Sequence, residues 1–217
     1  MAFSIFMKRN FMITTFKERV KNTIIDCSKI YYKNFIKKEF LIYSKSFTNA
    51  SFYTITAKKD NYLHLTGLNT RLSPNMFFDK CFSGTLQEND FEINSKQQKG
   101  SVRRKIKILS EAMNMPLLIN DMQIEENFEK NNILCSIATA NTSFTLGFTL
   151  LKNSKPKTLL KGFQLTNPGE IDLFVQHDKE TNENKIIINK IELHSIFDEI
   201  KLQVPHYFNE FNETDIR

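Results

Sequence analysis

Histidines are the side chains of this sequence best suited to proton transfer, because imidazole titrates close to neutral pH. The chain has four of them, His64, His177, His194 and His206. His64 stands out because Thr66 and Gly67 follow it in the string His-Leu-Thr-Gly. We find no H-x-x-x-H, C-x-x-C or G-x-S-x-G spacing, and so we expect no metal, no cofactor and no serine nucleophile. Acid–base chemistry by individual side chains remains as a hypothesis.

Cleavage of a phosphodiester is a reaction that such residues fit. RNA carries its own nucleophile, the 2′-hydroxyl, so its cleavage needs an acid, a base and groups that stabilise charge on the phosphoryl oxygens. His64 suits proton transfer, while hydroxyls and cations suit the phosphate. Those that we consider are Thr66, Arg103, Arg104, Ser143, Thr145, Thr158 and Lys161. The alternative is that this set arises by chance in a basic protein and that His64 is an ordinary surface or edge histidine.

Two stretches hold most of the positive charge. Residues 1–40 contain nine Lys or Arg against three Asp or Glu, a difference equal to the net charge of +6 of the whole chain. Residues 96–107 contain six Lys or Arg and no acid. Such charge indicates RNA, a nucleoprotein or an acidic protein surface as partner, although a solvated helix face would explain it equally well. The residues that we predict to bind nucleic acid are Lys33, Lys37, Lys99, Arg103 and Lys107.

The elements that must position His64 come from the first half of the sequence. Residues 12–36 have apolar side chains at steps of three or four, which predicts an amphipathic helix. Residues 40–47 and 51–57 are rich in β-branched and aromatic residues and predict a strand pair. Residues 62–67 then predict a third extended segment that ends in a turn at Gly67. His64 would therefore lie on a strand.

Two further helices follow. Ser73-Pro74 provides an N-cap and a first-turn proline, and Gly84 marks the end of the short helix that they begin. Residues 101–114 have apolar side chains at steps of four, three and four, so most of their basic residues lie on the opposite side. The second helix therefore predicts a positive stripe opposite a buried one.

The second half of the sequence predicts strands, because short apolar runs and period-two alternation replace the helical spacing. Residues 180–184 predict a hairpin connection, residues 152–162 a loop or edge strand, and residues 194–200 a brief helix. Helices before strands indicate an α+β fold, with N-terminal helices packed on a mainly antiparallel sheet. We expect a basic helical segment (1–40), one α+β domain (41–205) and a polar tail (206–217). The predicted strands are 122–129, 132–139, 143–150, 170–176 and 185–193.

Composition narrows the class of protein. The chain of 217 residues has 41% hydrophobic residues, 20 Phe and no Trp, so phenylalanine is expected to form the core. No apolar run approaches the roughly 18 residues of a membrane span, and no secretory signal is evident. The three cysteines, Cys27, Cys81 and Cys135, lie far apart in apolar surroundings and predict reduced, buried thiols. We expect a cytoplasmic protein.

Several strings, taken in order, resemble a known nuclease branch. They are YLHLTGLNTRLSPNMFFDKCFSGTLQENDFE, SVRRKIKILSEAM, ILCSIATANTSFTLGFTL and KPKTLLKG. The chain resembles, over residues 12–192, the phage-associated BECR nucleases, which belong to the barnase, EndoU, colicin and RelE-like superfamily, and in particular their fourth group. HLTG and TLLKG are the sharpest of these strings.

The resemblance implies a BECR-like α+β fold and metal-independent RNA cleavage by a protein of a phage or mobile element, acting in a bacterial host cell. It implies that His64 is the general acid or base, that Thr66 orients or binds phosphate, and that Thr158 and Lys161 line the phosphate site. Arg104 is added on the basis of its charge and helix face.

The sequence leaves three functions open: a ribonuclease, a non-catalytic inhibitor and a structural phage component. No second histidine stands in a matching string, so the pair of histidines of some ribonucleases is not evident. A non-catalytic inhibitor of the anti-defence type, such as an anti-CRISPR, would bind a host nucleoprotein or nucleic-acid channel through the same basic helices. A structural phage component would instead form a stable homo-oligomer.

Overall fold

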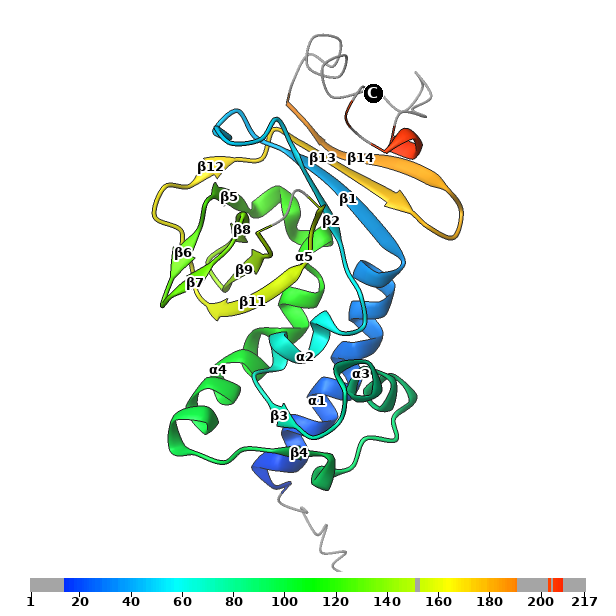
Figure 1. Cartoon of the computed structure of the whole chain (residues 1–217), viewed down its shortest axis with the longest axis vertical. Coiled ribbons are helices and arrows are strands. Elements are labelled where there is room, and N and C mark those ends of the chain that lie inside the picture. The colour runs from blue at the N-terminus through cyan, green and yellow to red at the C-terminus, as the bar shows by residue number, and fades with distance from the viewer. Residues whose placement is uncertain (1–13, 151–152, 191–202, 204, 209–217) are drawn as a thin grey trace, which may run out of the picture.

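A computed structural model describes residues 14–150, 153–190, 203 and 205–208, and it shows helices packed against two sheets (Figure 1). The strands of the two sheets lie in the upper half of the view, and α1 to α4 lie in the lower half. The fold is α+β, as predicted. The helices are α1 (Phe16–Tyr31), which continues as a π-helical turn (Tyr32–Ile36), α2 (Asn61–Thr66), α3 (Pro74–Ser83), α4 (Lys96–Met113) and α5 (Met115–Leu118), with 3₁₀ turns at Glu88–Asp90, Ile119–Asp121 and His206–Phe208.

The first sheet has the strand order β10-β2-β1-β13-β14. β1 pairs in antiparallel fashion with both β2 and β13, and β13 pairs in the same way with β14. Only β10 runs parallel to its neighbour, β2. The bounds are β1 (Lys38–Tyr43), β2 (Tyr53–Thr56), β10 (Asn153–Ser154), β13 (Leu173–Asp178) and β14 (Glu183–Asn189).

The second sheet has the strand order β11-β9-β8-β5-β12, and all of its pairs are antiparallel. Two short two-stranded pairs, β3–β4 and β6–β7, complete the strands. The bounds are β5 (Gln123–Glu126), β8 (Ile137–Ala140), β9 (Phe144–Phe148), β11 (Pro156–Lys161), β12 (Gly169–Glu170), β3 (Asn69–Thr70), β4 (Phe91–Glu92), β6 (Glu129–Lys130) and β7 (Ile133–Leu134).

The main core lies between the helices and the inner faces of both sheets, and most of the largest fully buried side chains of the described residues are phenylalanines. α1 contributes Val20, Ile24 and Cys27 to this core, so the described part of the basic N-terminal segment docks on the rest of the chain. The fully buried phenylalanines of the described residues are Phe35, Phe40, Phe52, Phe77, Phe78, Phe91, Phe128, Phe144, Phe148, Phe174 and Phe208.

Local signals placed several elements correctly. Ser73 caps α3 by accepting a hydrogen bond from the amide of Met76, and Gly84 ends the helix with φ of 74°. The predicted strand pair is β1–β2, and the predicted hairpin joins β13 to β14. α4 begins at residue 96 rather than 101, because Ser95 caps it and Gly100 lies inside the helix. The predicted helix 194–200 lies outside the described residues.

The prediction of a strand at residues 62–67 is wrong, because this segment is the helix α2. Tyr62 and Leu65 both lie in the core, which is the three-residue spacing of a helix face, while His64 between them is exposed. Gly67 ends the helix in the left-handed conformation with φ of 73°. The turn at Gly67 was therefore predicted correctly, and the element before it was not.

Glu126 joins the two sheets. It lies on β5 of the second sheet and accepts hydrogen bonds from β2 of the first sheet and from the segment that connects β1 to β2. Its donors are the amides of Thr48 (2.7 Å), Asn49 (3.0 Å) and Ala50 (3.2 Å), the hydroxyl of Thr48 (3.0 Å) and the hydroxyl of Tyr53 (2.7 Å). Burial alone would raise the pKa of Glu126, but the hydrogen bonds from Thr48, Tyr53 and Asn49 outweigh it and lower the pKa below the ordinary value of 4.5.

Replacing Glu126 with Gln should therefore lower the free energy of unfolding at pH 7 by about 1–3 kcal/mol. The ionised form stabilises the fold fully above its ordinary pKa, and this contribution is lost as the pH falls through the lower, folded value. Urea unfolding at pH 7 and at pH 3 would show a difference between wild type and variant that shrinks in acid. Glu129→Gln, at an exposed position on β6, is the matched control. Equal stability of the two variants would contradict this role.

Candidate active site

Three segments that are far apart in the sequence meet in one region. α2 contacts α4 and β11, and α4 also contacts β11 and β9. The segments that carry His64, the basic helix and the Thr-Leu-Leu-Lys-Gly string therefore lie side by side. The sequence gives these three segments in order along the chain, but only the structure shows that they are neighbours in space.

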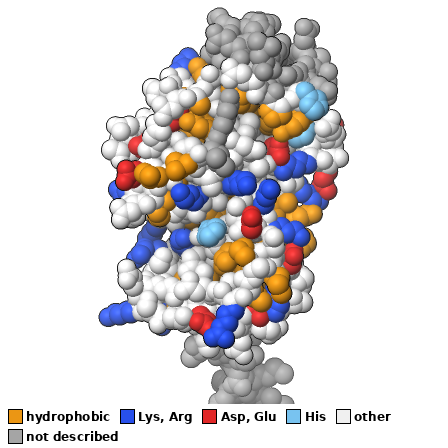
Figure 2. Space-filling model, viewed as in Figure 1, with side chains coloured by type: hydrophobic (Ala, Val, Ile, Leu, Met, Phe, Trp, Pro, Cys, Tyr) orange, Lys and Arg blue, Asp and Glu red, His pale blue; other side chains and the backbone are white. Residues whose placement is uncertain are grey.

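His64 is exposed at the rim of a hollow of about 440 Å³. Figure 2 shows a histidine side chain over α2 in the middle of this face, with Lys and Arg side chains above it, over β11, and beside it, over α4. An imidazole in water beside several cations can accept or donate a proton and can meet an anion. The hollow is lined by Leu63, His64, Gly67, Leu68, Asn69 and Thr70.

Thr66 is fully buried, and its hydroxyl is used within its own turn. The hydroxyl donates to the carbonyl of Leu63 at 2.8 Å and accepts from the amide of Leu68 at 3.2 Å. It therefore faces neither the hollow nor a substrate in this conformation. The role that the structure supports for Thr66 is to shape the turn after His64, rather than to bind phosphate.

Lys105 is a site residue that the sequence did not single out, although the structure places it directly behind His64. Its amino group donates to the carbonyl oxygen of His64 at 2.8 Å, and its chain runs beneath Gly67. The bond satisfies a carbonyl near the C-terminus of α2, where cations are favoured. Partial burial lowers the pKa of Lys105 to about 8. One signal was available, because Lys105 lies three residues after Val102 and four before Leu109, both buried.

Thr158 and Lys161 lie three residues apart on β11, so their side chains point to opposite faces of the sheet. Lys161 lies opposite Phe144, which belongs to the main core beneath the helices, and it is exposed at the end of the strand. Thr158 lies opposite Gly147 and is 5% exposed. The fold therefore brings Lys161 to the side that carries His64, and it removes Thr158 from that surface.

The remaining basic candidates divide between two regions. Arg104 is exposed on α4, and Lys99 and Arg103 lie over the ring of Phe16, each at 5.5 Å, on the side of α4 that faces α1. Lys33 is exposed near the other end of α1, where Lys37 forms an ion pair of 2.6 Å with Glu180. The five residues predicted to bind nucleic acid thus do not form one surface.

The other two candidate hydroxyls are those of Thr145, which forms hydrogen bonds with backbone groups, and Ser143, which lies in a loop. Thr145 is buried, and its hydroxyl donates to the carbonyl of Gly162 at 2.8 Å and accepts from the amide of Gln164 at 2.9 Å. Ser143 lies partly exposed in the loop before β9, and its carbonyl accepts from the amide of Gly162. Both therefore hold the end of β11, next to Lys161.

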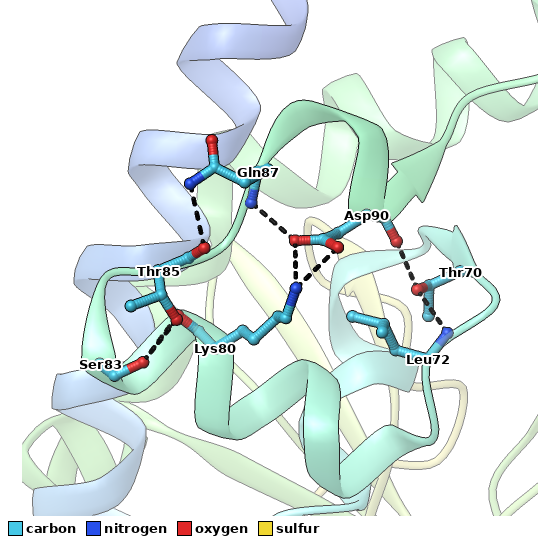
Figure 3. A network of polar contacts seen from close by, with 7 residues as sticks. All are labelled: Thr70, Leu72, Lys80, Ser83, Thr85, Gln87 and Asp90. Carbon is cyan, nitrogen blue, oxygen red and sulfur yellow. Dashed lines mark hydrogen bonds and ion pairs between the residues drawn. The ribbon is translucent and has the colours of Figure 1, made fainter.

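A polar network holds the loop that forms the rim of the hollow (Figure 3). The carboxylate of Asp90 accepts from the amino group of Lys80 at 2.9 and 3.0 Å and from the amide of Gln87 at 2.8 Å. The carbonyl of Asp90 accepts from the hydroxyl of Thr70 at 2.5 Å, and that hydroxyl accepts from the amide of Leu72 at 3.1 Å. The amide of Gln87 and the amino group of Lys80 lower the pKa of the Asp90 carboxylate and fix this residue, whose backbone carbonyl holds Thr70.

The part of the chain that the structure describes shows neither an exposed thiol nor a cluster of metal ligands. Cys27, Cys81 and Cys135 are free and buried, as predicted, and burial raises their pKa to about 12, about 12 and about 11. Within the described part of the chain, no three His, Cys, Asp or Glu side chains gather where they could hold a metal ion. Among the same residues, no helix combines the length and apolar character needed to cross a bilayer.

Gly67→Ala should change the environment of the His64 side chain in addition to lowering the stability of the fold. A Cβ at position 67 would lie 3.0 Å from Cδ of Lys105 and push the lysine away from the His64 carbonyl. Gly84→Ala is the matched control, because its φ of 74° is nearly the same and nothing lies within 4 Å. Both variants should lose about 1–2 kcal/mol through left-handed strain. Only Gly67→Ala should also shift the imidazole NMR signals of His64; equal spectra would contradict the hydrogen bond from Lys105.

The lowered pKa of Lys105 predicts a rise in stability between about pH 8 and its ordinary pKa of 10.5. In that window the unfolded chain holds the proton and the folded chain does not, so stability increases with pH. Denaturant unfolding of wild type and Lys105→Met across this range measures the effect. The variant should have the flatter profile, and parallel profiles would show that Lys105 keeps its ordinary pKa.

A family of known proteins matches most of the chain. A family model described as phage-Barnase-EndoU-ColicinE5/D-RelE like nuclease4 matches residues 23–202. That range contains α2, α4 and β11, the three elements that meet at His64. No curated protein and no solved structure matches the chain. The chain therefore belongs to the family of phage-Barnase-EndoU-ColicinE5/D-RelE like nucleases, in its fourth group.

Proposed function

We propose that this protein is a metal-independent ribonuclease that cleaves RNA through the 2′-hydroxyl, with His64 as its proton-transfer group. The observation that carries the proposal is the exposed imidazole of His64 in a hollow beside α2, an element that contacts both the basic helix α4 and the strand β11, which ends at the exposed Lys161. Membership of a nuclease-like family supports the reaction class. The choice of RNA rests on the simplicity of the site, because the 2′-hydroxyl removes the need for a nucleophile from the protein.

In the proposed reaction, the 2′-oxygen attacks phosphorus, the bond from phosphorus to the 5′-oxygen breaks, and a 2′,3′-cyclic phosphate and a free 5′-hydroxyl result. His64 takes the proton from the 2′-hydroxyl or supplies one to the departing 5′-oxygen, and water exchanges the other proton. Lys161 and Arg104 stabilise the charge that develops on the phosphoryl oxygens. Lys105 holds the backbone of His64 and does not touch the substrate.

We further propose that the protein acts in the cytoplasm of a bacterial host cell, on behalf of a phage or mobile element. The family name supports the phage link. The basic side chains of α1 and α4 support RNA as a partner, since phosphate contacts need little more than position and charge. The alternative is a non-catalytic inhibitor of a host nucleoprotein, and the absence of RNA cleavage by the purified protein would favour it.

Incubation of the purified protein with a mixed RNA pool in excess EDTA should yield fragments that end in 2′,3′-cyclic phosphate. His64→Ala should slow this cleavage by about 10²–10⁴-fold, the usual contribution of a general acid or base. His206→Ala, at another exposed histidine, is the matched control and should cleave at the wild-type rate. Lys161→Ala should also slow cleavage.

Two results would contradict the proposal. Equal cleavage by wild type and His64→Ala would remove the histidine from the reaction. Intact RNA in every lane, together with capture of a host nucleoprotein that charge reversal at Arg103 or Arg104 abolishes, would instead favour the inhibitor.

A further inference from the structure

A second hollow lies on the opposite side of α4 from His64, between α1 and α4. Its volume is about 390 Å³, and we call it the α1–α4 groove. Phe16 and Ile106, both partly exposed, give it an apolar floor above the buried Val20, and Thr23 lies beside them. Its rim carries three cations. The lining residues are Phe16, Arg19, Val20, Thr23, Arg103, Ile106 and Lys107.

The three cations of the groove keep their charge unpaired. Arg19, Arg103 and Lys107 are exposed, and within the described residues none of them forms an ion pair, while no Asp or Glu lines the groove. The situation differs between the π-helical turn and β1, where Lys37 and Lys38 are paired with Glu180 and Asp178. Positive charge that the fold leaves unneutralised around a hollow attracts an anion.

Two of these cations are also held in position. The guanidinium of Arg103 lies 5.5 Å from the centre of the Phe16 ring, a cation–π distance. One N–H of Arg19 donates to the carbonyl of Thr14 at 3.2 Å, which leaves most of its five donors for a ligand. The rim is therefore preorganised, and a phosphate that meets it need not order the side chains first.

We propose that the α1–α4 groove binds a single-stranded stretch of nucleic acid, with phosphates on the cationic rim and bases against the apolar floor. The ligand must offer anions and flat apolar surface together, as unpaired nucleotides do. A duplex keeps its bases stacked inside and presents only phosphates, so it leaves the floor uncovered. This inference extends the proposed function, because the bound strand would be the flank of the RNA that is cleaved at His64.

The exposed surface of α4 lies between the groove and His64. Successive residues of a helix are about 100° apart, so Arg104 lies between Arg103, on the groove side, and Lys105, on the His64 side. Arg104 is exposed. A strand that leaves the groove can therefore cross Arg104 and reach His64 while it stays close to positive charge. This path gives the substrate an extended, unpaired segment on one side of the cleaved bond.

Binding can be tested without cleavage by a fluorescein-labelled oligothymidylate of about 12 nucleotides, within the usual size of single-strand sites. DNA lacks the 2′-hydroxyl, so it survives even if the proposed reaction occurs. Anisotropy measured at several salt concentrations should show tight, salt-dependent binding. Arg19→Glu and Arg103→Glu should each weaken it and reduce the slope of log K against log salt by about 0.7 for each phosphate that the variant no longer neutralises.

Lys29→Glu is the matched control, because Lys29 is exposed on the same helix and does not line the groove. It should bind as wild type does. Lys107→Gln provides a milder variant if a charge reversal disturbs folding, which circular dichroism reports. If the protein binds the oligonucleotide normally but does not cleave RNA, the proposed reaction is contradicted and binding at the groove is still supported.

Three results would overturn the inference about the groove. One is equal binding by Lys29→Glu, Arg19→Glu and Arg103→Glu. Another is displacement of the oligonucleotide by a duplex at the same phosphate concentration, which would show that the floor has no part. The third is equally good displacement by polyglutamate, which would indicate an acidic protein as the partner.

Discussion

The burial of one face of α4 is the interaction on which the rest of the structure depends. Val102, Leu109 and Met113 are fully buried on this face, and α4 contacts α1, α2, α5, β9 and β11. Each such side chain contributes roughly 1.5–3 kcal/mol by leaving water. Because this face must point inward, the remaining residues of α4 have fixed directions. Lys105 is directed towards α2, and Arg103 and Lys107 are directed towards the groove beside α1.

This single constraint explains why one basic stretch serves two places. A run of lysine and arginine in the sequence suggests one positive surface, but a helix distributes its residues around an axis. Because one face of α4 is buried, Lys105 reaches the carbonyl of His64, whereas Arg103 and Lys107 lie at the open α1–α4 groove. The basic residues that follow α1 behave differently again, since Lys37 forms an ion pair with Glu180, just after β13, and Lys38 forms one with Asp178, at the end of β13.

Local signals in the sequence predicted the α+β class, the capped helix from Ser73 to Gly84, the β13–β14 hairpin and the phenylalanine core, because each depends on short-range rules. They could not predict α2, whose six residues are fewer than two turns, too few to show a helical period against the alternating Leu-His-Leu pattern. Nor could they predict that Thr66 is buried, which follows from the packing of α2 on its neighbours. The opposite directions of Thr158 and Lys161, by contrast, follow from the alternation of any strand and could have been inferred from their spacing.

The proposed function requires that α2, α4 and β11 together form one phosphate-binding active site around His64. A crystal structure with an RNA oligonucleotide that carries 2′-O-methyl groups, and so cannot attack itself, tests it most directly. We expect a phosphate within hydrogen-bond reach of the His64 imidazole, about 3 Å, with Lys161 or Arg104 on the same phosphate. A bound strand that leaves the hollow empty, with its phosphates only on other surfaces, would contradict it.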